Sequence, residues 1–191
     1  MKLQELAVNE SSGYSLQGSF TSDLTTSKVW LLSELEKITD QVGTVYVLGS
    51  WYGNLSLYMF LQPKLQHGKI INVETDADML AQSSRMLDHV GATNVQHMFK
   101  DANKLTYQQL GNDGLVVNTS LTDMQGRAWF DRIPQGTLVA MQARDQNSGN
   151  KFGGPDDILK KFPLEEVLYT GTLKLRDPET DYQRFMAIGK K

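Results

Sequence analysis

Short runs of β-forming residues alternate with stretches of helical periodicity along most of this 191-residue chain. The runs predict five strands, at 44–48, 69–73, 94–99, 115–117 and 137–141. Apolar residues at helical spacing lie between them and predict helices at 54–61, 77–90, 106–110 and 124–133. Strands that are apolar at nearly every position are typical of a sheet that is buried on both faces. The alternation therefore predicts βαβ units and an α/β fold with a mostly parallel sheet.

The two ends of the chain depart from this alternation. Ser and Gly are frequent at 11–18, which we interpret as a loop or flap, and a helix with Asp23 as its N-cap follows. Towards the other end, we expect a short helix at 158–162 and then strands at 166–175 and 182–188. The intervening turn of about six residues is too short for a helical crossover, so the two strands predict an antiparallel hairpin at the sheet's edge. The expected sheet then has seven strands.

Length and composition narrow the class of protein further. The length predicts one domain over 1–191, with an N-terminal loop and helix in 1–40 and the core in 44–191. The absence of cysteine excludes disulfides, thiolate zinc sites, iron–sulfur clusters and a cysteine nucleophile. The three histidines show no metal-ligand spacing, so no metal site is predicted.

The charge balance of 19 basic against 22 acidic residues argues against some partners. A net charge of −3 offers no general attraction to nucleic acid or to an anionic membrane. The opening MKLQELAVNESSG lacks the apolar core of a signal peptide, and no later stretch reaches the ~20 apolar residues of a membrane span. We therefore expect a cytoplasmic protein that does not associate with membranes.

A turn between Gly49 and Gly53 follows the first expected strand. In an open parallel sheet, ligands bind beyond the carboxyl ends of the strands. Glycines allow positive φ angles and a close approach of the backbone to a ligand. The turn predicts a ligand-binding loop, although a packing turn alone would also explain it. Because it contains neither Gly-x-Gly-x-x-Gly nor the Lys-Ser/Thr of a phosphate loop, dinucleotides and ATP are disfavoured.

Acidic residues follow the next two expected strands. Glu74 lies about twenty residues after the glycine turn, where a carboxylate can accept both ribose hydroxyls of a nucleoside. Asp101 follows the third strand and can accept from an adenine amino group, while the small Ala102 leaves room for the ring. A structural alternative is that Asp101, and Asp76 or Asp78, only cap the following helices.

The order of glycine turn, Glu74, Asp101 and terminal hairpin resembles the class I S-adenosylmethionine-dependent methyltransferases over 30–188. Four segments are similar to small methyltransferase-like proteins of tailed phages, namely 115–124, 133–139, 169–171 and 182–189. The resemblance implies a Rossmann-like three-layer sandwich and S-adenosylmethionine as the cofactor. The residues that it implies as cofactor contacts are Gly49, Ser50, Trp51, Tyr52, Gly53, Glu74, Thr75, Asp101, Ala102 and Asn118.

Two positions of the glycine motif depart from that family. The family usually has an acidic residue two places before the first glycine, and a third glycine between the outer two; Val47 and Trp51 stand there in this chain. The missing acid would order the loop and interact with the cofactor's ammonium group. Two interpretations of Trp51 stay open: its ring lines the pocket and attracts a cation, or it packs against the N-terminal segment.

Asn118 and Ser120 follow the fourth strand, where an acceptor would meet the methyl group. In amino-group methyltransferases an Asn or Asp followed by prolines and an aromatic holds the acceptor nitrogen there, and this chain lacks those prolines and the aromatic. Asn118 and Ser120 can instead tie the strand end to neighbouring backbone. Asp123 is a candidate general base, and a role at the start of a helix is its alternative. Asn118 and Asp123 are the candidate catalytic residues.

The sequence thus favours a methyltransferase that transfers a methyl group by in-line displacement to an unidentified acceptor, with a small molecule slightly favoured. A non-catalytic module that binds S-adenosylmethionine or a partner is the alternative, and an NAD-binding domain is less favoured. The surfaces expected to choose the acceptor are 1–40 and 144–155, and 11–20 is a candidate lid. The sequence does not predict an oligomeric state.

Overall fold

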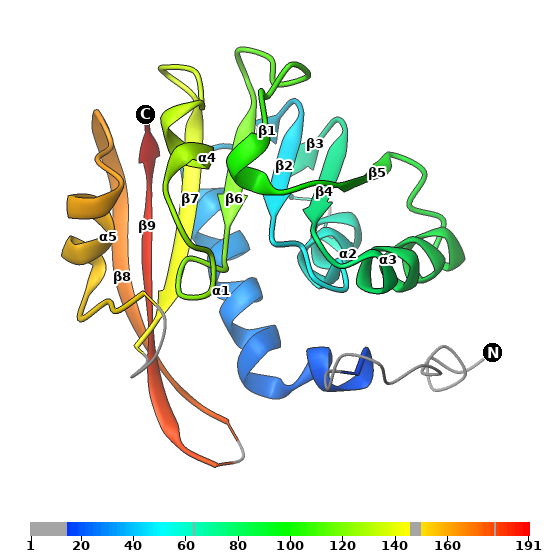
Figure 1. Cartoon of the computed structure of the whole chain (residues 1–191), viewed down its shortest axis with the longest axis horizontal. Helices are drawn as coiled ribbons and strands as arrows, with labels where there is room; N and C mark the ends of the chain where they lie inside the picture. Colours follow the sequence, from blue (N-terminus) through cyan, green and yellow to red (C-terminus); the bar gives the residue numbers. More distant parts are fainter. Residues whose placement is uncertain (1–14, 63, 146–149, 178) are drawn as a thin grey trace.

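The computed structural model describes residues 15–62, 64–145, 150–177 and 179–191. Its main sheet has seven strands, in the order β5-β4-β2-β6-β7-β9-β8 (Figure 1). In that order the strands are β5 (Val95–Phe99), β4 (Ile70–Glu74), β2 (Val45–Leu48), β6 (Leu115–Asn118), β7 (Leu138–Arg144), β9 (Asp181–Lys190) and β8 (Glu166–Arg176). The expected mostly parallel sheet with a C-terminal antiparallel hairpin is confirmed. A second, two-stranded parallel sheet, β1 (Gln41–Val42) with β3 (Gln66–His67), has no counterpart in the sequence prediction.

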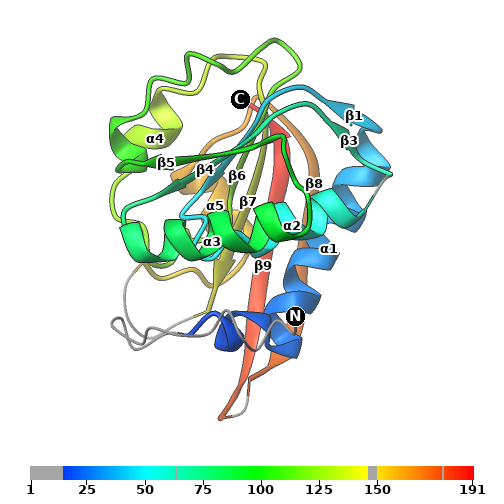
Figure 2. The same cartoon turned by 90° about the vertical axis from the view of Figure 1, so that its right-hand side faces the viewer.

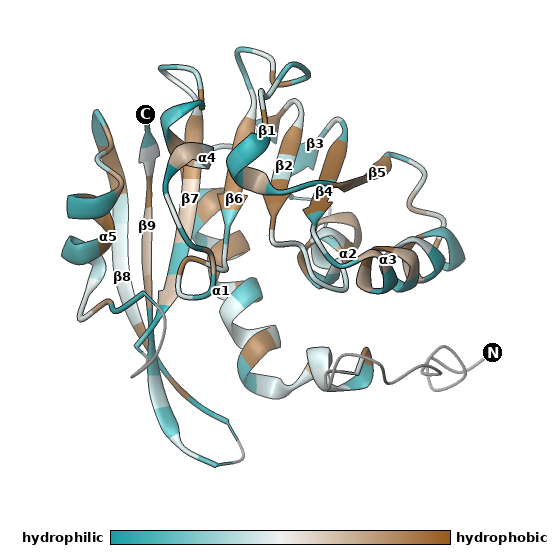
Figure 3. Cartoon of the chain, viewed as in Figure 1, coloured by the Kyte–Doolittle hydropathy of each residue, from teal (hydrophilic) through white to brown (hydrophobic). Residues whose placement is uncertain are grey.

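Helices cover both faces of the sheet, which gives three layers. The helices are η2 (Gln17–Phe20), α1 (Ser22–Ile38), α2 (Asn54–Leu61), α3 (Ala77–His89), η3 (Ala102–Lys104), α4 (Ala128–Asp131) and α5 (Pro155–Lys161). Val45 and Val47 of β2 pack with α1 and α2, whereas Tyr46 and Leu48 face the cluster that contains α4 and α5. Figure 2 shows α4 and α5 on one side of the sheet and α1 on the other. Because both faces are covered, successive residues of the central strands are all buried, and Figure 3 shows apolar residues gathered in these strands.

The strand order reverses at the centre of the sheet. The chain runs from β2 to its neighbour β4 and on to β5, and then returns to place β6 on the other side of β2. The carboxyl ends of β2 and β6 therefore border the point at which open α/β sheets bind their ligands. Leu48, the last residue of β2, lies beside Val73 of β4 and Asn118 of β6.

The terminal hairpin is longer than the parallel strands. β9 lies between β7 and β8 and is antiparallel to both. Figure 1 shows the tip of the hairpin projecting beyond the carboxyl ends of the parallel strands, near the first turns of α1. A hydrogen bond of 3.2 Å from Trp30 Nε1 to the Tyr169 hydroxyl links α1 to β8.

Three expectations about helices are corrected. Residues 106–110 form a turn rather than a helix: Tyr107 has a φ of 49°, and its buried hydroxyl donates to the Trp129 carbonyl. The helix expected at 124–133 is reduced to α4, because Gly126 has a φ of 79° and interrupts it. Asp23 lies inside the first turn of α1, which has Thr21 as its N-cap.

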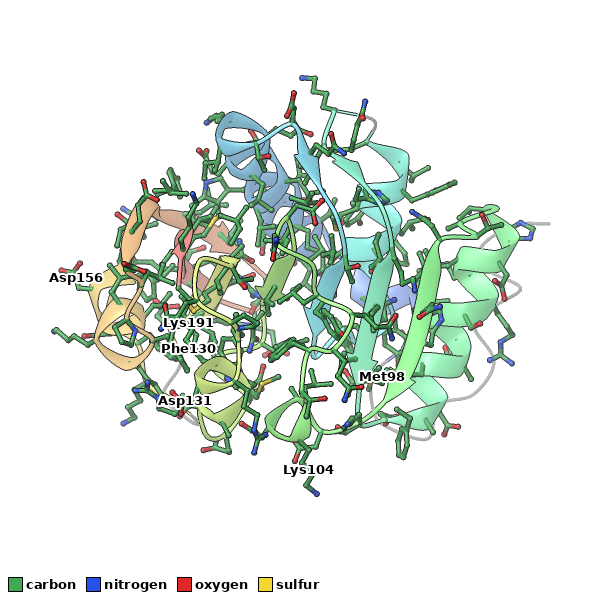
Figure 4. The ribbon with its side chains drawn as sticks, turned by 90° about the horizontal axis from the view of Figure 1, so that it is seen from above. Met98, Lys104, Phe130, Asp131, Asp156 and Lys191 are labelled. Atoms are coloured by element: carbon green, nitrogen blue, oxygen red, sulfur yellow. The ribbon has the colours of Figure 1, made fainter. Side chains whose placement is uncertain are left out.

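Lys191 fastens the end of β9 to α4. Its Nζ donates to the carbonyls of Asp131 and Ile133, at 2.8 and 2.7 Å, and lies 5.2 Å from the centre of the Phe130 ring. Figure 4 shows Lys191 beside Phe130 and Asp131. Burial lowers the pKa of this ammonium group, which Asp131 partly opposes. None of the helices in the described part of the chain combines the length and the apolar character of a membrane span.

Candidate active site at the carboxyl ends of the strands

The glycine loop has an unusual backbone. Gly49, Trp51 and Gly53 have φ angles of 59°, 53° and 74°, so every second residue lies in the left-handed region. The Ser50 amide donates to the Val73 carbonyl at 3.1 Å, and the Gly53 amide donates to the Ser50 carbonyl at 2.8 Å. Trp51 adopts this conformation although it has a Cβ, which costs about 1–2 kcal/mol. The third glycine of the resembling family would carry no such strain at this position.

Neighbouring side chains leave no space for a Cβ atom at Gly49 or at Gly53. A Cβ on Gly49 would lie 2.8 Å from Ser120 Oγ, and this hydroxyl donates to the Gly49 carbonyl at 3.3 Å. A Cβ on Gly53 would overlap Ser83 Oγ. Ser83 belongs to a buried polar chain in which it contacts Asn72 at 3.3 Å and His97 at 3.0 Å. The loop is thus packed against β6 on one side and against α3 on the other.

Glu74 ends β4 and holds the glycine loop. Its Oε2 accepts from the Trp51 amide at 2.9 Å, and its Oε1 accepts from the Thr75 amide and hydroxyl at 2.7 and 3.2 Å. The carboxylate is half-buried, so part of it stays accessible. Glu74, from the neighbouring strand β4, thus fixes the middle of the glycine loop in this chain.

The acidic residues after β4 and β5 also have structural partners. Asp76 caps α3, because its Oδ1 accepts from the Met79 amide at 3.0 Å. Asp101 Oδ1 accepts from the Asn103 amide at 2.9 Å and caps η3. Ala102 is buried beside it. Since Glu74 pairs with Phe99 across β4 and β5, Glu74 and Asp101 lie at the same edge of the sheet.

Asn118 and Asp123 differ in their surroundings. Asn118 is fully buried at the end of β6, where its Oδ1 accepts from the Ser120 amide at 2.9 Å and its Nδ2 lies 3.3 Å from the Met124 sulfur. It ties the strand end to the following turn. Asp123 is exposed in that turn, and α4 begins five positions later, so Asp123 does not start a helix.

Trp51 packs with the N-terminal segment. Its ring lies 5.3 Å from that of Tyr52, and both belong to an apolar cluster that includes Leu16 and Phe20. A second link joins this segment to the start of α2, because Asn54 Nδ2 donates to the Ser19 carbonyl and hydroxyl, each at 2.9 Å. Both residues are buried. Of the candidate lid, 15–20 forms a turn and η2, and 11–14 lies outside the described residues.

A group of charged residues on α1 and β9 borders the edge formed by the carboxyl ends of the parallel strands. The sequence analysis did not predict this group. The Tyr182 hydroxyl donates to Asp23 Oδ2 at 2.6 Å, and Arg184 Nη2 donates to the Thr119 carbonyl at 2.8 Å. Asp23, Lys28 and Arg184 are all at least nine-tenths buried. Arg184 stands inside β9, directly before the buried run 185–188, and a charge beside such an apolar run is the signal that sequence reasoning overlooked.

Burial shifts the pKa values of this group. Burial lowers the pKa of Lys28 to about 7. The charge of Arg184 contributes to this lowering, and the charge of Asp23 opposes it. Burial and the hydrogen bond to Asp23 raise the pKa of the Tyr182 hydroxyl. For Asp23, burial favours the neutral form, but hydrogen bonds led by that from Tyr182 outweigh it and lower the pKa.

Two surface hollows of the described structure lie away from the glycine loop. One is on the hairpin, and it is lined by Asp145, Lys174, Leu175, Arg176, Asp181, Tyr182 and Gln183. The other lies between α2 and β3. Within the described ranges, no three His, Asp or Glu side chains gather into a set that could ligate a metal ion.

Comparisons with known proteins identify the fold. No protein-family profile and no curated protein matches the sequence. In structure, the chain is similar to the N-methyltransferase NodS of Bradyrhizobium japonicum in complex with S-adenosyl-L-homocysteine, with a TM-score of 0.65, 9% identity and coverage of 97% of this chain and 95% of that one. A proposed RNA methyltransferase from Pyrococcus horikoshii gives a TM-score of 0.66 and 15% identity over 88% of this chain and 84% of that one. The [4+2]-cyclase SpnF gives a TM-score of 0.67 and 12% identity over 91% of this chain and 84% of that one.

These similarities concern architecture. At such identities, a shared fold does not by itself establish the reaction, and one of the three similar structures is that of a cyclase. The α/β Rossmann-like sandwich of the S-adenosylmethionine-dependent methyltransferases is confirmed for this chain.

Proposed function

We propose that this protein binds S-adenosylmethionine and transfers its methyl group to an acceptor. The observation that carries the proposal is the convergence, at the point where strand order reverses, of the left-handed glycine loop, Glu74 and Asp101. Ligands bind at this place in open α/β sheets. The methyltransferase fold of the similar structures supports the same assignment.

The residues present fit this cofactor. Ser50 Oγ is buried in the glycine loop and has no hydrogen-bond partner among the described residues, which leaves it available to a ligand. Glu74 would accept from the ribose hydroxyls, and Asp101 from the adenine amino group beside Ala102. The loop from Gly49 to Gly53 would hold the methionine portion. Thr75 follows Glu74 in the chain, and Asn118 lies beside Leu48, the residue before the loop.

The chemistry needs little from the protein beyond placement. When bound, S-adenosylmethionine supplies an electrophilic methyl group on a sulfonium. The chain then has to orient the acceptor in line with that group and to exclude water, and positioning of this kind is worth ~7–11 kcal/mol in well-oriented systems. Asn118 lies at the end of β6, on the side where the acceptor would enter, and Asp123 is exposed nearby.

Calorimetric titration with S-adenosylmethionine and S-adenosylhomocysteine tests the proposal. Glu74→Ala should weaken binding by about tenfold or more, because it removes hydrogen bonds to a charged group. Glu74→Gln, whose amide oxygen can still accept from the Trp51 amide, separates loss of charge from loss of the loop contact. Glu165→Ala, at an exposed position before β8, is the control and should bind like the wild type. No binding by the wild type at millimolar ligand would refute the proposal.

A non-catalytic binding module is the second candidate. The observation that favours it is Trp51, which stands where the resembling family has a glycine and lies in one apolar cluster with Leu16 and Phe20. Binding without release of S-adenosylhomocysteine in the presence of small molecules that carry a carboxylate or a phosphate would support this candidate over catalysis. A fluorescence titration with NADH should show no binding, because the loop lacks Gly-x-Gly-x-x-Gly.

A further inference from the structure

Two buried cations occur on the acceptor side of the candidate site. Lys28 comes from α1 and Arg184 from β9, and each is 8% exposed. Their charges influence each other, since the charge of Arg184 helps to lower the pKa of Lys28. Burial of one cation is costly unless it is paired, and burial of two like charges together is costlier. Such an arrangement requires a compensating partner.

The described residues supply that partner only in part: Asp23 favours the charged form of Lys28, and Tyr182 and Asp123 favour that of Arg184. Arg184 Nη2 donates to the Thr119 carbonyl, but its Nε is buried without a hydrogen-bond partner among the residues described. The Lys28 ammonium has one long contact, 3.5 Å to the Leu24 carbonyl. Neither residue takes part in any ion pair found in the described ranges. Both side chains thus retain donor capacity.

Nearby acids are engaged elsewhere. Asp23 accepts a short hydrogen bond from Tyr182. Asp177 pairs with Arg144 at 2.7 Å, and the Arg144 guanidinium lies 3.8 Å from the centre of the Tyr182 ring. Asp123 is exposed and acts on Arg184 only as a nearby charge. The two buried cations are therefore incompletely neutralised.

Their position links these cations to the acceptor. Thr119, which Arg184 contacts, is the residue after Asn118, and Ser120 contacts the glycine loop at Gly49. Figure 1 places the first turns of α1 and the lower part of the hairpin beside the carboxyl ends of β6 and β7. Arg184 thus lies beside the end of β6, where the acceptor is expected, and Lys28 is near enough to feel its charge.

We propose that Lys28 and Arg184 bind the anionic group of the methyl acceptor, a small molecule with a carboxylate or a phosphate. This inference rests on the proposed function. An oxyanion would accept from Arg184 Nε and Lys28 Nζ together, as charge-assisted hydrogen bonds. A polynucleotide is disfavoured because a backbone phosphate, flanked by its neighbours, does not reach two side chains that are nine-tenths buried.

The pH dependence follows from the groups that face Lys28. These are Arg184, which lowers its pKa, and Asp23, which raises it and is itself bonded to Tyr182. Lys28 loses its proton as the pH rises through about 7. Anion affinity should therefore fall by about tenfold between about pH 6 and about pH 8.

Binding of simple anions to the full chain tests the inference. Titrations with acetate and with inorganic phosphate at about pH 6.5 distinguish a carboxylate site from a phosphate site. The pH profile of anion affinity is measured with sulfate, because sulfate itself does not change its protonation state in this range. Lys28→Met should lose anion binding and its pH dependence, whereas Lys160→Gln, an exposed lysine of α5, should leave both unchanged. Equal affinity of Lys28→Met and wild type, or a flat sulfate profile, would overturn the inference.

If the Lys28→Met variant does not fold, the pH profile of sulfate binding to the wild type still tests the inference. Titration of S-adenosylmethionine in parallel separates this inference from the proposed function. Cofactor binding without anion binding would refute the inference alone. Anion binding that depends on Lys28 without cofactor binding would refute the proposed function, and with it the assignment of the anion as an acceptor.

Discussion

At the scale of single residues, Glu74 and Trp51 define the candidate site together. The Glu74 carboxylate accepts from the Trp51 amide, and this contact holds Trp51 at a positive φ. The Trp51 ring offsets part of the strain by packing with Tyr52 and the N-terminal residues. Sequence reasoning marked Glu74 and Trp51 separately, but their contact depends on the spacing of β2 and β4, which the sequence does not display.

Substitution of Trp51 separates backbone strain from packing. Trp51→Gly and Trp51→Ala both remove the ring, and both should destabilise the protein because the half-buried ring contributes apolar contacts. Trp51→Ala keeps a Cβ at a φ of 53°, so it should be less stable than Trp51→Gly by about 1 kcal/mol. Urea unfolding of both variants measures this difference. Equal stability of the two would show that position 51 is not strained.

At the scale of elements, the strands were the most predictable part of the fold. The central parallel strands β4, β2 and β6 are short, mostly apolar runs with helices on both sides of the sheet, so their pattern is visible locally. The helix boundaries were less predictable. The helix expected at 124–133 is cut short by Gly126, and the segment from 106 to 110 is held as a turn by the contacts of Tyr107 with Tyr46 and Trp129. Tertiary contacts overrode local propensity in both places.

The end of α4 offers a test at this scale. Lys191 donates to two carbonyls at the C-terminal end of this short helix, where a positive charge is also favourable. Lys191→Ala should lower the free energy of unfolding by about 1 kcal/mol. Lys190→Ala is the matched control, since this exposed neighbour makes only a 3.8 Å ion pair with Glu166. The interpretation would be wrong if thermal unfolding showed the two variants to be equally stable.

At the scale of the whole molecule, the fold brings the start of α1 against the end of the chain. Asp23 and Tyr182 are 159 positions apart and share a short, buried hydrogen bond. Ser27 and Gln142, both fully buried, exchange two hydrogen bonds of 3.1 Å between α1 and β7. These contacts place Lys28 beside Arg184 and create the charged region proposed to bind the acceptor.

That arrangement predicts how stability depends on pH. Unfolding returns the pKa of Lys28 from about 7 to its ordinary 10.5, so the unfolded chain binds more protons between these values. The free energy of unfolding should therefore rise with pH above about 7, by a few kcal/mol at most, until Tyr182 opposes the rise above about pH 10. Chemical unfolding at a series of pH values measures this, and Lys28→Met should abolish the rise. An unchanged profile in Lys28→Met would show that Lys28 is not the cause.

The sequence by itself determined the seven strands of the main sheet, most of the helices between them, the terminal hairpin and the common edge at which the glycine loop, Glu74 and Asp101 lie. Those features follow from local apolar patterning and from the rule that parallel strands end at a common edge. Only the tertiary structure decided that Glu74 contacts the glycine loop, that Trp51 shares an apolar cluster with the N-terminal segment, and that Lys28 lies within range of the charge of Arg184. These contacts join residues distant in the chain, and their distances depend on how helices pack on the twisted sheet, which no local pattern encodes.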